Sequence, residues 1–300
     1  MGASARQKPA SVADTTTRCI IRPLRRRYIP RANAPASERQ PTRYGHGVLT
    51  VSRLSVTPVR ALALQHPERI ELDEHGVRDD RRYTLLDRGR IFDGTKFGPL
   101  VQVGARLEHD PERLTLTFPT GEVVTSEVAL GEPIHPVIYD RRFTARPVIG
   151  PWAAALSAHA GRSLQLIRSE RLPGERDRNP VSILSEASVA ELARQGNDGR
   201  PLDARRFRML IHVAGAHPHQ EDEWMGSEVR IGQAVLRVVR PVSRCVVTTQ
   251  DPGSGRRDFA TLHAIKAYRG MRDGRKIDFG VYADVVTPGP VAVGDEVVPA

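Results

Sequence analysis

The chain has 300 residues, of which 39% are apolar and 27% charged. It contains no run of 18 apolar residues, which excludes a transmembrane helix and fits a soluble protein of one or two domains. The net charge of +10 is localised, because residues 1–47 carry ten basic and two acidic groups, whereas residues 48–300 carry 35 and 33. We therefore expect no specific nucleic-acid partner for the body of the chain.

Residues 1–47 are rich in Arg, Pro, Ala, Ser and Thr and offer little material for a core. We expect a disordered basic tail, either simply solvated or in weak contact with nucleic acid or anionic lipid. Only two cysteines occur, Cys19 in this tail and Cys245 far from it. A disulfide framework is therefore not expected, and a reducing, cytoplasmic location is.

Alternating and β-branched segments dominate the rest of the chain, separated by Gly- and Pro-containing turns. Strands are expected at 48–51, 54–56, 82–87, 114–118, 122–130, 164–168, 208–213, 279–286 and 291–298, and a hairpin that turns at Gly232 is expected within 229–240. Helices are expected at 152–160, 185–195 and 259–269, with Ser185 as an N-cap and Gly161 and Gly196 as stops. Many short strands with few helices predict a mainly β, α+β fold of barrels or sandwiches.

Cys245 lies between a strand that ends near Pro241 and a β-branched run that begins at Val246. An extended segment would place Ser243 and Cys245 on one face and Arg244 on the other. Nearby guanidinium groups favour the thiolate, the form that ligates metals or attacks electrophiles. The alternative is a buried cysteine that acts as a small apolar residue.

Other candidate chemistry is weaker. His212, His217 and His219 precede the acidic residues 221–223, a set that can bind zinc or iron but also suits a solvated loop. Four of the 45 basic residues are Lys, so 41 are Arg, which suits oxyanion binding or simply reflects genome composition. No P-loop and no Gly-x-Ser-x-Gly elbow occurs.

Several motifs around Cys245 resemble one known family, the MOSC (molybdenum cofactor sulfurase C-terminal) domain. The motifs are Glu221–Trp224, Val229–Gly232, Val242–Thr249, Asp251–Pro252, Phe279–Ala283, Pro288–Gly289 and Val293–Val297. Upstream, Val51–Pro58 and Asp80–Tyr83 resemble the β-barrel domain that precedes MOSC in larger members. The resemblance covers about residues 48–298 and implies an N-terminal β-barrel-like domain at 48–165 and a MOSC-type β-barrel domain at 166–300.

The resemblance implies a molybdenum cofactor, a pterin dithiolene, with Cys245 as the protein ligand to the metal and as the catalytic residue. Members with this domain plan include the amidoxime-reducing components, which reduce N-hydroxylated compounds with electrons from a separate reductase. An electron-donor reductase or ferredoxin and a small-molecule substrate are the partners this implies. The resemblance also implies pyridoxal phosphate binding, as an association of the family as a whole and not of particular residues in this sequence.

Further positions carry over from the resemblance to this sequence. Arg60, Arg81 and Arg208 are expected to hold the cofactor's phosphate, and Ser243 to form a hydrogen bond near the metal. Two departures stand out. Leu210 replaces an asparagine that follows the arginine of the motif, and Arg178–Asn179 replaces small hydroxyl residues before Pro180.

The sequence therefore predicts a molybdenum-dependent oxidoreductase that reduces a small N-oxygenated substrate. Two alternatives stay open. Cys245 could carry a persulfide and deliver sulfur, or the protein could store or hand over the cofactor without turnover.

Overall fold

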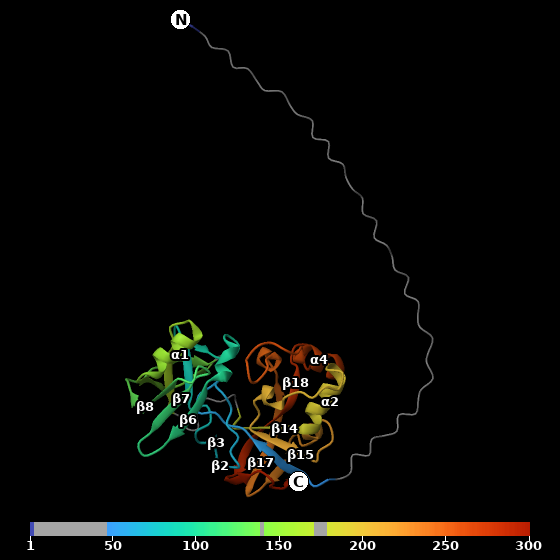
Figure 1. The fold of residues 1–300 in the computed structure, drawn as a ribbon. Coiled ribbons are helices and arrows are strands. Elements are labelled where there is room, and N and C mark those ends of the chain that lie inside the picture. Colours follow the sequence, from blue (N-terminus) through green and yellow to red (C-terminus); the bar gives the residue numbers. More distant parts are fainter. Residues whose placement is uncertain (3–46, 139–140, 171–178) are drawn as a thin grey trace. The chain divides into compact units, whose positions relative to one another are not determined.

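The computed structural model describes residues 1–2, 47–138, 141–170 and 179–300 (Figure 1). The expected disordered tail therefore falls almost entirely outside the described residues. The described part contains 20 strands and four α-helices, which confirms a mainly β fold with few helices. No helix among the described residues is long and apolar enough to cross a membrane.

Seven strands form the larger part of a barrel, in which each strand is hydrogen-bonded to the next. In spatial order they are β1 (Thr50–Leu54), β15 (Ile211–Ala214), β14 (Val181–Ser185), β18 (Asp278–Thr287), β17 (Ala234–Ser243), β16 (Glu228–Ile231) and β20 (Val297–Pro299). The sheet nearly closes, because Val51 N donates to Asp295 O and Val297 N donates to Leu49 O, both at 2.8 Å. Closure removes the free edge strands that invite aggregation.

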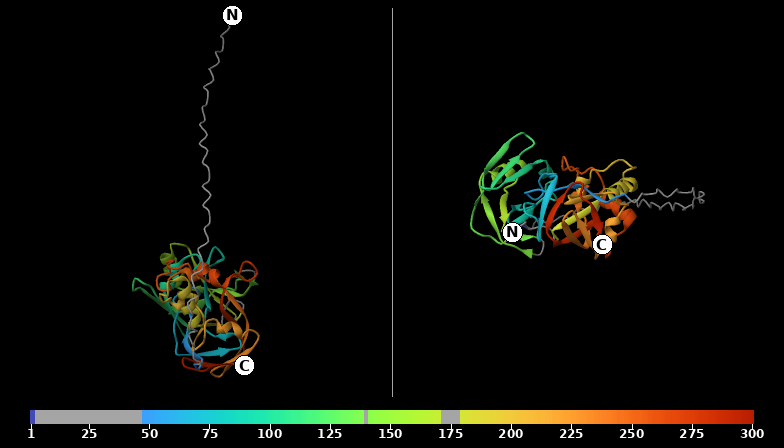
Figure 2. Two further views of the ribbon diagram at one scale, coloured as in Figure 1. Left: turned by 90° about the vertical axis from the view of Figure 1, so that its right-hand side faces the viewer. Right: turned by 90° about the horizontal axis from the view of Figure 1, so that it is seen from below.

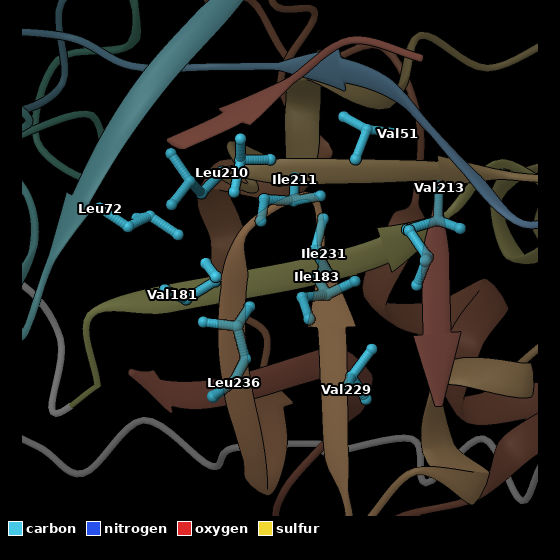
Figure 3. Packing of buried hydrophobic residues seen from close by; sticks show 14 of the residues in the cluster. Val51, Leu72, Val181, Ile183, Leu210, Ile211, Val213, Val229, Ile231 and Leu236 are labelled. Atoms are coloured by element: carbon cyan, nitrogen blue, oxygen red, sulfur yellow. The ribbon is translucent and has the colours of Figure 1, made fainter. Parts of the chain in front are cut away.

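Buried side chains, which alternate with more exposed ones along the strands, fill the interior of the barrel. In β17 the buried residues Ala234, Leu236 and Val238 alternate with more exposed ones, as the two-residue period of a strand requires. They join valines, leucines and isoleucines from the other barrel strands in one buried cluster (Figure 3). Val51 and Leu72 belong to this cluster although they come from the beginning of the described chain.

A second seven-stranded sheet is built mostly from the first half of the chain. Its strands are β11 (Arg141–Arg142), β10 (Val137–Ile138), β5 (Arg90–Phe92), β4 (Tyr83–Asp87), β13 (Gln165–Ser169), β12 (Ala145–Ile149) and β9 (Ala129–Leu130). Two three-stranded sheets complete the fold: β19 (Gly289–Ala292) with β2 (Arg69–Asp73) and β3 (Gly76–Val77), and β6 (Gly104–Glu108) with β7 (Arg113–Thr117) and β8 (Val123–Glu127).

Strand pairing crosses the predicted boundary between residues 165 and 166 in both directions. Strand β1 lies beside the orange-to-red barrel strands in both further views (Figure 2), and it pairs antiparallel with β15. Strand β2 pairs with β19 near the end of the chain. Conversely, β13 pairs with β4 and β12 of the second sheet. The division into domains 48–165 and 166–300 stays a prediction, and the strands of the two parts are interleaved.

The helices and short 3-10 turns cover the sheets. They are α1 (Trp152–Ala160), α2 (Glu186–Gly196), α3 (Gln220–Glu223), α4 (Thr261–Arg269), η1 (Gly98–Gln102), η2 (Ala204–Phe207) and η3 (Val246–Thr249). Helices α2 and α4 lie side by side against the barrel (Figure 1). Apolar residues of both helices pack with Phe207, Met209, Val242 and Phe279. This layer fixes η2 and η3, the turns that carry the candidate site.

Local signals placed two helices correctly. Helix α1 ends at Gly161, which adopts the left-handed conformation with φ 64°, and Ser185 caps α2 by accepting from Ser188 N. The expected strand at 208–213 is wrong at its start. Arg208 ends η2 with a left-handed φ of 53°, and the strand begins only at Ile211.

Candidate functional site

The five residues singled out from the sequence line one cavity. Its volume is about 310 Å³, and its walls include Arg60, Arg81, Arg208, Ser243 and Cys245. These positions lie up to 185 residues apart (245 minus 60), so only the folded chain brings them together.

Cys245 follows the end of β17 and precedes η3. Its backbone is extended, with φ −122° and ψ 178°. Thr248 fixes it by donating to the Cys245 carbonyl from the backbone N at 3.1 Å and from Oγ1 at 2.9 Å. The side chain is exposed, so the alternative reading as a buried apolar residue is wrong.

Arg60 and Arg81 reach the cavity from a pair of crossing loops. Arg60 N donates to Tyr83 O at 2.8 Å, and Arg81 N donates to Thr57 O at 2.6 Å. Thr57 N in turn donates to the fully buried Asp80 at 2.8 Å. Arg81 has a left-handed φ of 57°, a conformation that is uncommon for residues other than glycine.

Arg208 is the second left-handed arginine of the site. Its Nη2 donates to Leu62 O at 2.7 Å, and its own carbonyl accepts from Arg81 Nη2 at 3.0 Å. Burial, together with the positive charges of Arg81 and Arg60, lowers the pKa of Arg208 to about 9. The cavity thus holds a cationic group whose charge a bound anion would stabilise.

Sequence reasoning missed two further arginines of the wall, Arg206 and Arg244. Arg206 is buried and donates to Asp258 at 3.1 and 3.0 Å. Arg244 stacks over Phe207, with 5.1 Å between the guanidinium carbon and the ring centre. Their positions beside Arg208 and Cys245 in the sequence were the available signal. Five arginines and one acidic residue, Asp93, line the cavity, which makes it suited to an anion.

Ser243 lines the cavity two residues before Cys245 and is likewise exposed. Its Oγ donates to Asp278 Oδ1 at 2.7 Å. Arg244 is half-buried and directed at the Phe207 carbonyl and ring. The expectation that Arg244 faces away from Ser243 and Cys245 is met only in part, because all three line the cavity.

The two departures from the family pattern differ in their surroundings. Arg178 lies outside the described residues. Asn179 lines the cavity, where its Oδ1 accepts from Arg240 Nε at 2.6 Å and its Nδ2 donates to Asp284 Oδ1 at 2.8 Å. Leu210 instead packs in the barrel core, and its backbone N donates to Ser182 Oγ at 3.0 Å.

A glycine contact joins the loops on either side of the cavity. A Cβ on Gly98 would lie 1.9 Å from Gly255 O, and Gly255 has a left-handed φ of 72°. Beside this contact, the buried Gln250 donates from Nε2 to Gly94 O at 2.8 Å. The loop that follows Cys245 is therefore held tightly against the turn at 93–98.

The histidines are not gathered into a metal site. His212 is fully buried, and burial lowers its pKa to about 3. His219 contacts Tyr268 and Arg269, and burial lowers its pKa to about 4. Among the described residues no group of three or more His, Cys, Asp or Glu side chains could hold a metal ion.

Comparison with known families matches part of the chain that lines this cavity. The model of the MOSC domain matches residues 159–298, a little under half of the chain, so this segment is similar to a MOSC domain. It contains Arg208, Ser243 and Cys245, whereas Arg60 and Arg81 precede it.

Curated proteins that are similar to this chain include members of two groups. Human mitochondrial amidoxime-reducing component 1 is 35% identical over 130 residues, covering 40% of this chain and 37% of the relative. Molybdenum cofactor sulfurase of Caenorhabditis briggsae is 27% identical over 244 residues, covering 78% of this chain and 33% of the relative. The matches thus span about a third of the length of each relative.

Solved structures of similar proteins include the YuaD protein from Bacillus subtilis. It has a TM-score of 0.42 and 13% identity, and the match covers 84% of this chain and 96% of that one. YiiM from Escherichia coli has a TM-score of 0.31 and 17% identity over 43% of this chain and 58% of that one.

Proposed function

We propose that this protein binds a molybdenum cofactor in the arginine-lined cavity and reduces a small N-hydroxylated compound. The observation that carries the proposal is the meeting of an exposed thiol, Cys245, with Arg60, Arg81 and Arg208 on one cavity wall. The relatives named for amidoxime reduction and for the molybdenum cofactor support the same assignment.

The residues present fit such a cofactor. A thiolate is a soft ligand that suits molybdenum alongside the sulfur atoms of a dithiolene. Arginine forks suit the phosphate of the pterin, since they donate paired hydrogen bonds to its oxygens. Arg60, Arg81 and Arg208 would hold the phosphate, and Cys245 would ligate the metal.

The bound cofactor would supply two-electron oxygen-atom transfer. In the overall reaction an amidoxime takes up two electrons and two protons, its N–O bond breaks, and an amidine and one water molecule leave. The chain's own residues bind and orient the partners. Arg208 and Arg81 neutralise negative charge, and the Thr248 contacts hold Cys245 in place.

The two electrons would come from a separate reductase or ferredoxin. The chain has only two cysteines, too few for a cysteine-ligated iron–sulfur cluster. We place the protein in the cytoplasm, because so low a cysteine content with no disulfide pattern is typical of a reducing compartment.

Metal and pterin analysis tests the proposal. Protein purified without oxygen from a host that makes the cofactor should contain molybdenum and pterin near one equivalent each. Cys245→Ala should lose most of the molybdenum. Arg88→Gln, at a guanidinium 96% exposed, is the matched control and should keep it. Wild-type protein with neither molybdenum nor pterin would contradict the proposal.

A second function is favoured by the exposure of Cys245 and by the match to molybdenum cofactor sulfurases over 78% of the chain. Here the Cys245 thiolate would take the outer sulfur of a donor persulfide and release the donor thiolate. Cyanide-labile sulfur that disappears in Cys245→Ala, without bound molybdenum, would support this function over the first. Bound cofactor without turnover of any hydroxylamine would instead indicate cofactor storage.

A further inference from the structure

The hydroxyl of Ser243 is held by an ion pair, Asp278 and Arg272, which does not include the arginines proposed to bind the cofactor. Ser243 and Asp278 are partners in the register of β17 and β18, and Ser243 Oγ lies 2.7 Å from Asp278 Oδ1. Arg272 donates to both oxygens of the same carboxylate, from Nε at 2.5 Å and from Nη2 at 3.1 Å. The Asp278 side chain is only 12% exposed.

This arrangement decides the direction of the Ser243 hydrogen bond. A carboxylate paired with a guanidinium carries no proton, so the serine must donate its only hydroxyl hydrogen to Asp278. The serine oxygen keeps two lone pairs. Arg272 Nη2 approaches it at 3.4 Å, a weak contact that occupies at most one of them. Ser243 therefore offers the cavity an acceptor and no donor.

Ser243 is also well placed to meet a substrate. Its side chain is exposed and lines the same cavity as Cys245, two residues further along the chain. Because Ser243 and Cys245 line the same cavity, the serine oxygen is placed to contact a ligand bound at Cys245.

We propose that Asp278 and Arg272 fix Ser243 as a hydrogen-bond acceptor, and that Ser243 thereby selects substrates with a hydrogen on the oxygenated group. This inference rests on the proposed reductase function and adds the residues that select its N-hydroxylated substrates. Hydroxylamines, hydroxamic acids and amidoximes carry an N–OH hydrogen and are favoured. N-oxides carry none and are disfavoured, since their oxygen would face the serine lone pairs. Ser243 is a specificity residue, and Asp278 and Arg272 are positioning residues.

A matched pair of substrates tests the selection. N,N-dimethylhydroxylamine and trimethylamine N-oxide differ by one hydrogen replaced with a methyl group. With reduced viologen as electron source, we expect the molybdenum-loaded wild type to show a kcat/KM about tenfold higher for the hydroxylamine, the discrimination that one hydrogen bond typically provides. Ser243→Ala should lower the value for the hydroxylamine and raise the value for the N-oxide, so that the two values converge.

Variants of the positioning pair complete the test. Asp278→Asn should reduce the preference at least fivefold, because its amide can donate to Ser243 and release the hydroxyl hydrogen toward the cavity. Asp198→Asn is the control, since this carboxylate is exposed in a loop outside the hairpin at 272–276 and pairs with Arg200. Molybdenum content and thermal midpoint are measured on every sample. If the molybdenum content and the thermal midpoint are unchanged while the substrate preference changes, the substitution acts on substrate selection and not on cofactor loading or folding.

The possible outcomes separate a failure of this inference from a failure of the proposed reductase function. Wild-type protein that reduces both compounds with equal kcat/KM overturns the inference and leaves the reductase function standing. Loaded wild-type protein that reduces neither overturns both. The Ser243→Ala variant needs no charged pair to fold. A preference for the hydroxylamine that persists in this variant also overturns the inference.

Discussion

Arg81 donates from Nη2 to the backbone carbonyl of Arg208 at 3.0 Å, across 127 positions of the sequence. Both residues adopt left-handed backbone conformations, with φ values of 57° and 53°. A side chain from the first half of the chain thus fixes the backbone of the turn that carries Arg208. The fold brings the two positively charged guanidinium groups together. A bound anion would relieve the repulsion between them.

Inorganic phosphate should therefore stabilise the protein when the cofactor is absent. A ligand that binds the native state alone raises the thermal midpoint, and the rise grows with the logarithm of the ligand concentration above the dissociation constant. We expect a rise in wild-type protein with increasing phosphate, reduced by at least half in Arg208→Gln. Arg88→Gln removes an exposed guanidinium elsewhere and should respond as wild type does. Equal shifts in all three proteins, measured by differential scanning fluorimetry, would place the anion somewhere other than this cavity.

Stability should fall in mild acid because of His212. Its pKa is about 3 in the folded protein, below the usual value near 6.5 that the unfolded chain retains. The unfolded state then binds the extra proton as the pH drops below about 6.5, so folding loses about 2 kcal/mol between pH 7 and pH 5 from this residue. When it is measured by urea unfolding, the unfolding free energy of His212→Leu should not show that part of the decrease between pH 7 and pH 5. His75→Gln, at an exposed histidine, should retain it.

Glu221 should have the opposite effect. Burial raises the pKa of this carboxyl group, which is fully buried and accepts from Ser188 Oγ at 2.7 Å. A raised folded-state pKa stabilises the protein at low pH, and that contribution is lost as the pH rises through the folded value. Glu221→Gln should therefore gain stability relative to wild type with rising pH, by an amount on the order of 1 kcal/mol. Glu223→Gln, on the exposed side of the same short helix, should show no such trend in denaturant unfolding.

The contact between Gly98 and Gly255 should tolerate no side chain. An added Cβ on Gly98 meets a backbone oxygen at 1.9 Å, and backbone cannot move aside as a side-chain tip can. We expect Gly98→Ala to cost about 1–3 kcal/mol in unfolding free energy. It should also lower the amount of bound cofactor. Gly253→Ala is the control in the same loop, because its nearest neighbour would be Asp251 Oδ1 at an ordinary 3.5 Å. Similar losses in both variants would argue against a specific role for the contact.

Sequence reasoning succeeded where the physical cause is local. The stop of α1 at Gly161 and the cap of α2 at Ser185 depend on a few neighbouring residues. The meeting of Arg60, Arg81 and Arg208 with Cys245 came from family resemblance, because nothing in their spacing brings such distant positions together.

Other features could not be predicted because their causes are not local. Arg208 reads as part of an apolar strand, yet its turn is fixed by Arg81 and Leu62 from distant loops. Asp278 gave no signal of its own, since its role depends on the register between β17 and β18. Arg206 and Arg244 were hidden among 41 arginines, few of which line the cavity.

The place of β1 in the barrel has a consequence for how the chain can be divided. The MOSC match begins at residue 159, but the strand that pairs with β15 and meets the segment 294–297 comes from residues 50–54. A fragment cut to the limits of the match would leave the hydrogen-bonding edge of β15 bare and remove Val51 and Leu54 from the core. The segment that the MOSC model matches therefore lacks a barrel strand, and gene truncations to the limits of that match should yield aggregated protein.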